Sequence, residues 1–155
     1  MRKKDREITD TKELEEILQK ADVCRIAFAV DGTPYIVTMN FGYIWKDNLI
    51  LYFHCAKEGK KLDLMKKNNT ICFEMDIDHK LVEAENACDW GMKYRSIVGI
   101  GLLESVAGEE EKKKGLDCIM DHYGFSGKKE YGEKVLNMTK VLRLTVTEFT
   151  GKKKS

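Results

Sequence analysis

The chain has 155 residues, with 27 lysines and arginines against 26 aspartates and glutamates. A formal net charge of +1 argues against general nucleic-acid binding through bulk charge, and 43% hydrophobic with 34% charged residues is typical of a globular protein rather than a disordered one. No apolar run approaches the roughly 20 residues that cross a bilayer, and the N-terminus lacks the apolar stretch of a signal peptide, so we expect no membrane partner and no leader.

A chain of this length is expected to fold as one domain, residues 1–155. Its first predicted element is a short amphipathic helix over residues 10–21, opened by Asp10 and Glu13 at the spacing of a capping box. The apolar residues of this helix recur at i, i+3, i+4 and i+7: Leu14, Ile17, Leu18 and Ala21.

From about residue 23 to residue 77 the main period changes to two, and the first three strands are predicted over 23–30, 35–45 and 49–55. The middle strand is long, and its large side chains share one face: Tyr35, Val37, Met39, Phe41, Tyr43 and Trp45. Its other face carries only small or polar residues, Thr38, Asn40 and Gly42. That face is either an ordinary solvated surface or a platform for a flat ligand.

The remaining elements alternate less regularly. We expect a helix over 57–69, a strand over 71–77, a loop over 78–91, a strand over 94–106, a helix from 108, a loop with a marginal helix over 124–138, a strand over 141–149 and a frayed tail over 151–155. Six strands joined mostly by tight turns predict a mainly β protein, an antiparallel barrel with a few peripheral α-helices.

The segment from Phe53 to Leu62 is the most informative for function. A strand ends, small residues follow, and a helix begins with the adjacent Lys60 and Lys61. Free N–H groups and the positive end of the dipole lie at a helix N-terminus, so two lysines beside them make a suitable phosphate site. The alternative is a solvated lysine face, which is the commoner fate of a lysine run.

Other polar residues give weaker indications. Arg95 and Ser96 at the start of a strand could reach a phosphate or a ring carbonyl, and His54 could donate a proton, orient a ligand or bind a metal. Cys55 adjoins His54, but neighbours in a strand point to opposite faces, so no nucleophilic pair is predicted. Five cysteines without C-x-x-C or zinc-finger spacing predict free thiols in a reducing cytoplasm and no metal site.

Taken together, these residues resemble the pyridoxamine 5′-phosphate oxidase-like, FMN-binding split β-barrel family, and within it the nitroimidazole-resistance (Nim) type. The matching segments span nearly the whole chain in order: Arg2–Ile8, Pro34–Tyr43, Leu51–Leu62, Tyr94–Gly101 and Thr150–Lys152. The resemblance implies a six-stranded split barrel of Greek-key type and a homodimer with two FMN sites at its interface.

The resemblance also implies roles for individual residues. Thr38, Met39 and Asn40 would face the isoalloxazine ring; the phosphate would be held by Lys60 and Lys61 with Gly59 and the segment His54, Cys55 and Ala56. Arg95 and Ser96 would add contacts, possibly from the other subunit. Cys55 departs from the family, where a serine is common at this position, and its thiol is a weaker donor than a hydroxyl.

The function implied is that of an FMN-dependent oxidoreductase, in which flavin takes electrons from NAD(P)H and reduces a small flat substrate such as a nitroaromatic. His54 is the candidate proton donor. The rival hypothesis is a non-catalytic split-barrel protein that binds flavin or haem without turnover. A deazaflavin cofactor is also compatible with the lysine-bearing groove.

Overall fold

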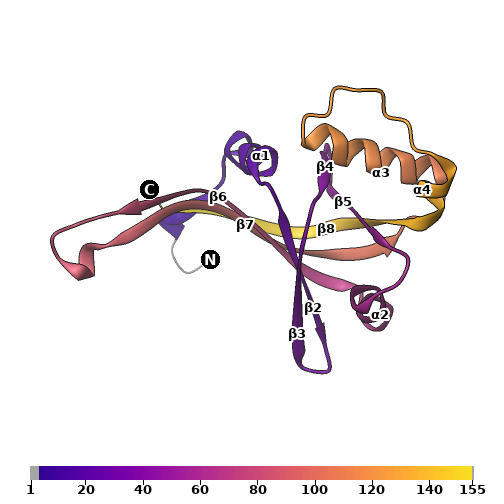
Figure 1. Cartoon of the computed structure of the whole chain (residues 1–155). Helices are drawn as coiled ribbons and strands as arrows, with labels where there is room; N and C mark the ends of the chain where they lie inside the picture. Colours follow the sequence, from indigo (N-terminus) through magenta and orange to yellow (C-terminus); the bar gives the residue numbers. More distant parts are fainter. Residues whose placement is uncertain (1–3, 155) are drawn as a thin grey trace.

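An antiparallel sheet of eight strands forms the centre of the computed structural model, which describes residues 4–154 (Figure 1). The strands are β1 (Glu7–Ile8), β2 (Cys24–Val30), β3 (Thr33–Met39), β4 (Gly42–Trp45), β5 (Leu49–Ala56), β6 (Thr70–Val82), β7 (Gly91–Ser105) and β8 (Thr139–Lys154). The helices are α1 (Thr11–Lys20), α2 (Lys60–Lys67), α3 (Glu109–His122) and α4 (Glu133–Met138). Arg2 and Lys3, which belong to the first matching segment, lie outside the described residues.

The strand order is β3-β2-β6-β7-β8-β5-β4, with β1 paired to β8, and every pairing is antiparallel. Figure 1 shows the β2–β3 hairpin on one side of the long β6–β7–β8 ribbon and β4 on the other. A mainly antiparallel sheet with few helices confirms the predicted fold class. Eight strands replace the six expected, because one predicted strand is divided in two and the two-residue β1 is added.

The core lies where the inward sides of these strands meet. The period-two pattern of the sequence is obeyed in β2, where Cys24, Ile26 and Phe28 are buried and the residues between them are only half-buried. Burial of this kind removes apolar surface from water at about 25 cal/mol per Å² and fixes the register, because a slip by one residue would expose the whole set.

The predicted long strand over 35–45 breaks at Asn40 and Phe41, and this is the main difference from the expectation. Its first part, β3, pairs with β2, and its second part, β4, pairs with β5 at the opposite end of the strand order. The face was predicted correctly, because the large side chains of both parts all pack on the core. We call residues 40–41 the crossover, since they connect the two outer strands of the sheet.

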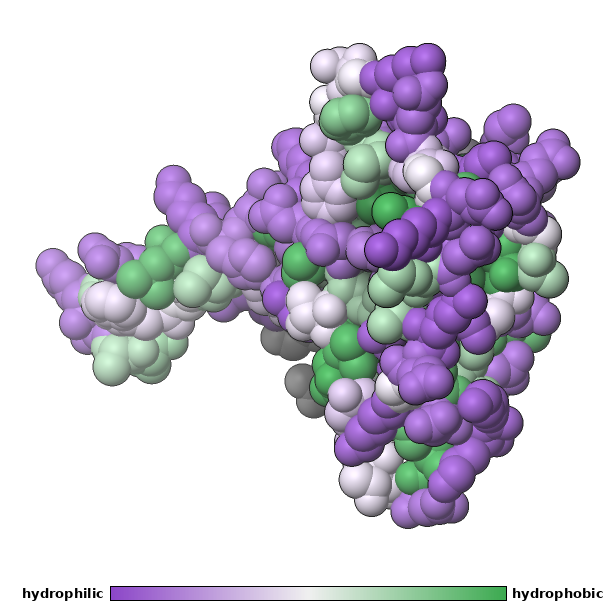
Figure 2. All heavy atoms as spheres, turned by 45° about the vertical axis from the view of Figure 1, so that its right-hand side comes forward, coloured by the Kyte–Doolittle hydropathy of each residue, from purple (hydrophilic) through white to green (hydrophobic). Residues whose placement is uncertain are grey.

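Two segments expected to be irregular are strands. β6 continues beyond residue 78 and pairs there with the beginning of β7, Leu81 lying opposite Met92, so the two strands form a projecting arm. The C-terminal segment up to Lys154 pairs with β7 and β1. The loop expected over 78–91 is therefore shorter, since only residues 83–90 lie between the two strands, and the expected frayed tail was wrong. Ser155 lies outside the described residues. Figure 2 shows hydrophobic residues, in green, among hydrophilic ones on this projecting arm.

The helices cover the ends of the barrel. The side chain of Asp10 accepts a hydrogen bond of 2.9 Å from the N–H of Lys12 and so caps α1, as its position in the sequence predicted. α3 packs against β4 and β5, and it approaches so closely that a Cβ built on Gly42 would lie 2.4 Å from the backbone carbon of Cys118. Within residues 4–154, no helix is both long and apolar enough to pass through a bilayer.

Candidate functional site

A cavity of about 380 Å³ lies where β3 ends, β5 ends and α2 begins. We call it the crossover cavity. Its lining includes many of the residues selected from the sequence, namely Thr38, Met39, Asn40, His54, Cys55, Ala56 and Lys61. Val37, Met138 and Thr139 complete the lining and were not anticipated. Residues from four separate segments of the chain therefore meet at one site.

The barrel brings these segments together through strand register. Cys55 and Ala56 at the end of β5 lie opposite Lys140 and Thr139 at the start of β8, so both strand ends reach the same edge. Beyond β5 the chain turns at Gly59, whose φ of 141° and ψ of 161° fall in a region that essentially only glycine adopts. This turn starts α2 directly beside the cavity.

The beginning of α2 is rich in unpaired donors. The N–H groups of Leu62 and Asp63 both donate to the carbonyl of Gly59, whereas those of Lys60 and Lys61 have no backbone partner within the part of the chain that the structure describes. The side chain of Lys61 is half-buried in the cavity wall. A cation beside free amides at a helix N-terminus is suited to an anion such as a phosphate.

The two adjacent lysines do not share this environment. The Nζ atom of Lys60 lies 4.3 Å from the centroid of the Tyr35 ring, a cation–π contact, and Lys60 does not line the crossover cavity. Gly59 lines a neighbouring cavity of about 400 Å³ together with Lys140. Lys140 is a cation near the crossover cavity that sequence reasoning missed, because its place follows only from its pairing with Cys55.

His54 and Cys55 point to opposite sides of β5, as expected for neighbours in a strand. His54 is exposed and Cys55 is buried, although both contribute atoms to the cavity wall. Burial raises the pKa of the Cys55 thiol, and the nearby charges of Lys61 and Lys140 counteract this only in part. Cys55 is therefore a neutral thiol at physiological pH and not a nucleophile.

The crossover is held by a side chain that the sequence analysis did not select. The hydroxyl oxygen of Tyr123, just after α3, receives hydrogen bonds from Asn40 Nδ2 at 3.1 Å and from the N–H of Phe41 at 3.2 Å. The same hydroxyl donates to the carbonyl of Asp22 at 2.7 Å. No local signal identifies Tyr123, since its partners lie far away in the sequence.

Arg95 and Ser96 do not reach the crossover cavity within one chain. Arg95 forms ion pairs with Glu16 at 2.8 Å and with Asp78, and these partners raise the pKa of its guanidinium although burial acts in the opposite direction. Ser96 is a buried residue of β7. Contacts from these residues to a ligand held by another subunit remain a prediction.

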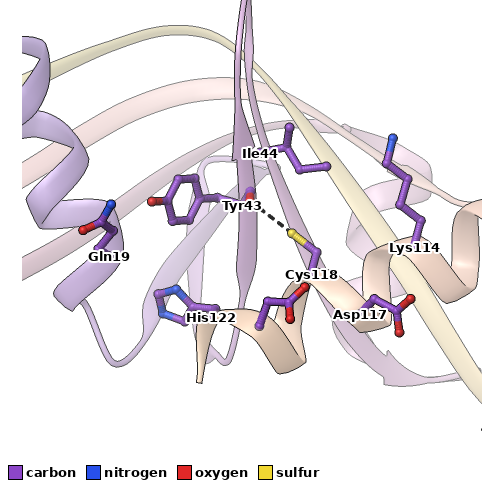
Figure 3. A pocket seen from close by; sticks show the side chains of 8 residues that line it. Gln19, Tyr43, Ile44, Lys114, Asp117, Cys118 and His122 are labelled. Carbon is purple, nitrogen blue, oxygen red and sulfur yellow. Dashed lines mark hydrogen bonds between the residues drawn. The ribbon is translucent and has the colours of Figure 1, made fainter. Parts of the chain in front are cut away.

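A second cavity, of about 470 Å³, lies between α1, β4 and α3 and was not anticipated (Figure 3). Cys118 donates a hydrogen bond of 3.1 Å to the carbonyl of Tyr43, and burial, together with the charge of Asp121, raises the pKa of its thiol to about 11. His122 Nε2 lies 2.9 Å from the carbonyl of Ala21, which can only accept a hydrogen bond. The cavity thus contains no activated nucleophile.

Candidate metal ligands are not clustered in the described chain. Within residues 4–154, no group of three or more histidine, cysteine, aspartate or glutamate side chains is placed to hold a metal ion.

Comparison with known proteins agrees with the fold. A protein from Bacteroides thetaiotaomicron, provisionally named as a 5-nitroimidazole antibiotic resistance protein, is 33% identical, with 94% of this chain and 85% of that chain covered and a TM-score of 0.81. A FAD and haem binding protein from Mycobacterium smegmatis is 18% identical, with coverages of 97% and 74% and a TM-score of 0.82. The flavocytochrome Anf3 from Azotobacter vinelandii is 19% identical, with coverages of 96% and 69% and a TM-score of 0.79.

Among curated proteins, no sequence matches the chain closely enough to count as a relative. The family model described as pyridoxamine 5′-phosphate oxidase matches residues 10–153, which is nearly the whole chain. This match confirms the resemblance found in the sequence, and the chain belongs to the pyridoxamine 5′-phosphate oxidase family.

Proposed function

We propose that the chain binds FMN in the crossover cavity and acts as an FMN-dependent oxidoreductase. The observation that carries this proposal is that Lys61, beside the free amides at the start of α2, lines the same cavity as Thr38 and Asn40 of the polar strand face. A phosphate suits the lysine and the amides, and a flat ring suits the polar strand. Membership of the family supports the same ligand.

The residues of the cavity have distinct tasks in this proposal. Lys61 binds the phosphate, the strand from Thr38 to Asn40 orients the ring, and the buried Met39 and Cys55 exclude water behind it. The bound flavin supplies hydride and electron transfer between NAD(P)H and a small flat substrate. His54, exposed at the cavity, is positioned to hold a proton for the reduced substrate.

A homodimer with FMN at its interface is part of the proposal. Ile36, Ala27, Cys72 and Ile100 align in register across β3, β2, β6 and β7 and form an outward apolar band. Ile36 is 64% exposed and Ile100 39% exposed, so large apolar side chains stand in solvent at both ends of this band. Thr38, two residues from Ile36 on the same face, lines the cavity, so a second copy on this band would lie beside the flavin.

A nitroaromatic compound is the substrate class that one relative favours. The protein from Bacteroides thetaiotaomicron with 33% identity is named for resistance to 5-nitroimidazoles. Reduction of a nitro group by a flavin would account for such a role in this chain. A cytoplasmic location agrees with five cysteines that are all free thiols.

A non-catalytic flavin- or haem-binding protein is the second candidate. Exposed His54 at the cavity is the type of residue that binds haem iron axially, and two structural relatives are named for haem or flavocytochrome content. Both relatives share less than a fifth of their residues with this chain, so their likeness supports the fold and not the ligand.

The absorption spectrum of the protein as purified tests both candidates. Flavin bands, with FMN identified by mass after release, are expected, and a Soret band would favour haem. NAD(P)H oxidation that depends on an added nitroaromatic acceptor is then expected of the enzyme. A colourless protein that takes up no FMN during titration would refute the proposal.

A further inference from the structure

The hydroxyl of Tyr123 takes part in three hydrogen bonds, and only one of them can use its proton. The carbonyl of Asp22, 2.7 Å away, can only accept. The backbone N–H of Phe41, 3.2 Å away, can only donate. The proton of Tyr123 therefore goes to Asp22, and the oxygen of Tyr123 acts as an acceptor toward the crossover.

This proton count fixes the orientation of the Asn40 side chain. The amide nitrogen and oxygen of an asparagine have nearly the same shape, so their placement has to follow from the partners. Since the Tyr123 oxygen has no proton left to donate, the amide group facing it at 3.1 Å must be the NH₂ donor. Asn40 Oδ1 is then turned away from Tyr123, and it has no hydrogen-bond partner among residues 4–154.

We propose that Asn40 Oδ1 is a fixed hydrogen-bond acceptor for the imide N3–H of an isoalloxazine ring. This inference rests on the proposed binding of FMN in the crossover cavity, which Asn40 lines. The imide is the only ring N–H of an oxidised flavin, so a fixed acceptor at the ring selects that group. Haem presents no N–H at its edge, and the acceptor therefore discriminates against it.

Tyr123 is the positioning residue in this arrangement. It is not among the residues that line the crossover cavity, its hydroxyl binds Asn40 and the backbone of Phe41, and its own place is set by Asp22 between α1 and β2. Without its hydroxyl, the Asn40 amide is free to turn and present NH₂ in place of the oxygen. The specificity for an imide would then be lost although Asn40 is still present.

The test compares FMN with its N3-methyl derivative, which retains the phosphate but cannot donate at this position. Dissociation constants are measured by flavin fluorescence titration of the whole protein. For the unaltered protein we expect N3-methylation to weaken binding about tenfold or more, because one hydrogen bond is lost and a polar atom is left unpaired. In Asn40→Leu the new side chain is similar in size but has no acceptor. The ratio of the dissociation constant of N3-methyl-FMN to that of FMN is there expected to fall to about onefold to threefold.

A second pair of variants separates positioning from stability. Tyr123→Phe is expected to reduce the discrimination to about threefold, whereas Tyr131→Phe removes the hydroxyl that donates to Asp117 at 2.8 Å and is expected to keep the full ratio. If the Asn40→Leu protein still rejects N3-methyl-FMN, the effect is steric and the inference is wrong. Equal binding of the two flavins to the unaltered protein also refutes it while leaving FMN binding intact. If the unaltered protein binds neither FMN nor N3-methyl-FMN, both the proposed function and the inference are refuted.

Discussion

Lys60 Nζ lies 4.3 Å from the centroid of the Tyr35 ring, whereas the next residue, Lys61, lines the crossover cavity. Successive residues of a helix point about 100° apart, so two adjacent lysines at the start of α2 serve different surfaces. One packs over β3 and the other faces the candidate phosphate site.

Replacement of each lysine should therefore have a different effect. Lys61→Ala is expected to weaken FMN binding about tenfold or more, because a charge-assisted hydrogen bond to phosphate is lost. Lys60→Ala, the matched control, is expected to change the affinity less than about threefold, since a solvent-exposed cation–π contact is worth about 0.5–1 kcal/mol of stability. Titration of both variants with FMN measures the difference, and equal losses would show that both lysines hold the phosphate.

Any side chain at Gly59 is expected to destabilise the fold, because the backbone there has a φ that residues other than glycine rarely adopt. A Cβ at Gly59 would meet no atom within 4 Å, so Gly59→Ala costs only the strain of φ at 141°. Gly108 is the matched control, because it also precedes a helix in open space but has an ordinary φ of −85°. We expect the free energy of unfolding of Gly59→Ala to lie about 1–3 kcal/mol below that of Gly108→Ala, measured by urea denaturation. Indistinguishable denaturation midpoints would contradict this account.

The five thiols should differ strongly in reactivity. Cys88 is exposed on the arm, whereas burial raises the pKa values of Cys24, Cys55, Cys72 and Cys118. A disulfide reagent at about pH 8 is expected to modify Cys88 rapidly and the other four thiols much more slowly, because the thiolate is the reactive form. In Cys88→Ser the rapid phase should disappear, and its persistence would place an accessible thiolate in the barrel.

The ion cluster on β2 and β6 should give two carboxylates opposite effects of pH on stability. Burial alone would raise the pKa of Asp76, but hydrogen bonds from Arg25 at 2.7 Å and His79 at 2.7 Å lower it below its usual value. Burial and the charge of Asp76 instead raise the pKa of Glu74.

A lowered folded pKa stabilises the fold above the unfolded value of about 3.9, and this contribution is lost as the pH falls through the folded pKa. Asp76→Asn should therefore be about 1 kcal/mol less stable than the parent at pH 7, with the gap closing below about pH 4. For Glu74→Gln, the stability relative to the parent should change with pH in the opposite direction, because the ionised form of Glu74 is disfavoured in the fold. Thermal denaturation from pH 3 to pH 7 measures both, and parallel slopes would contradict the assignment.

The sequence was sufficient to predict the parts of the fold that depend on neighbouring residues. Alternation located the buried face of β3 and β4, and the change from strand to helix around Gly59 identified the beginning of α2. Thr38, Asn40 and Lys61 were selected on these grounds and meet at one cavity. Each of these inferences needed only short-range periodicity, chain direction and residue chemistry.

What could not be predicted depends on distant partners. The break after Met39 is held by Tyr123, which is 82 residues beyond Phe41. The ion pairs of Arg95 with Glu16 and Asp78 also depend on residues distant in the sequence, and a contact from Arg95 to a ligand of another subunit stays a prediction. The arm was missed because a bulge after Ile77, with Asp78 at a φ of 58°, interrupts the alternation that continues beyond it.

The crossover has a consequence for the lifetime of the protein. Residues 40–41 connect the two outer strands of the sheet, and Asn40 also forms part of the cavity wall. A ligand that binds only the folded chain at 100 times its dissociation constant adds about 2.7 kcal/mol to the free energy of unfolding. Empty copies should accordingly be the first that cellular proteases remove, and the amount of this protein in a cell should follow the supply of its ligand.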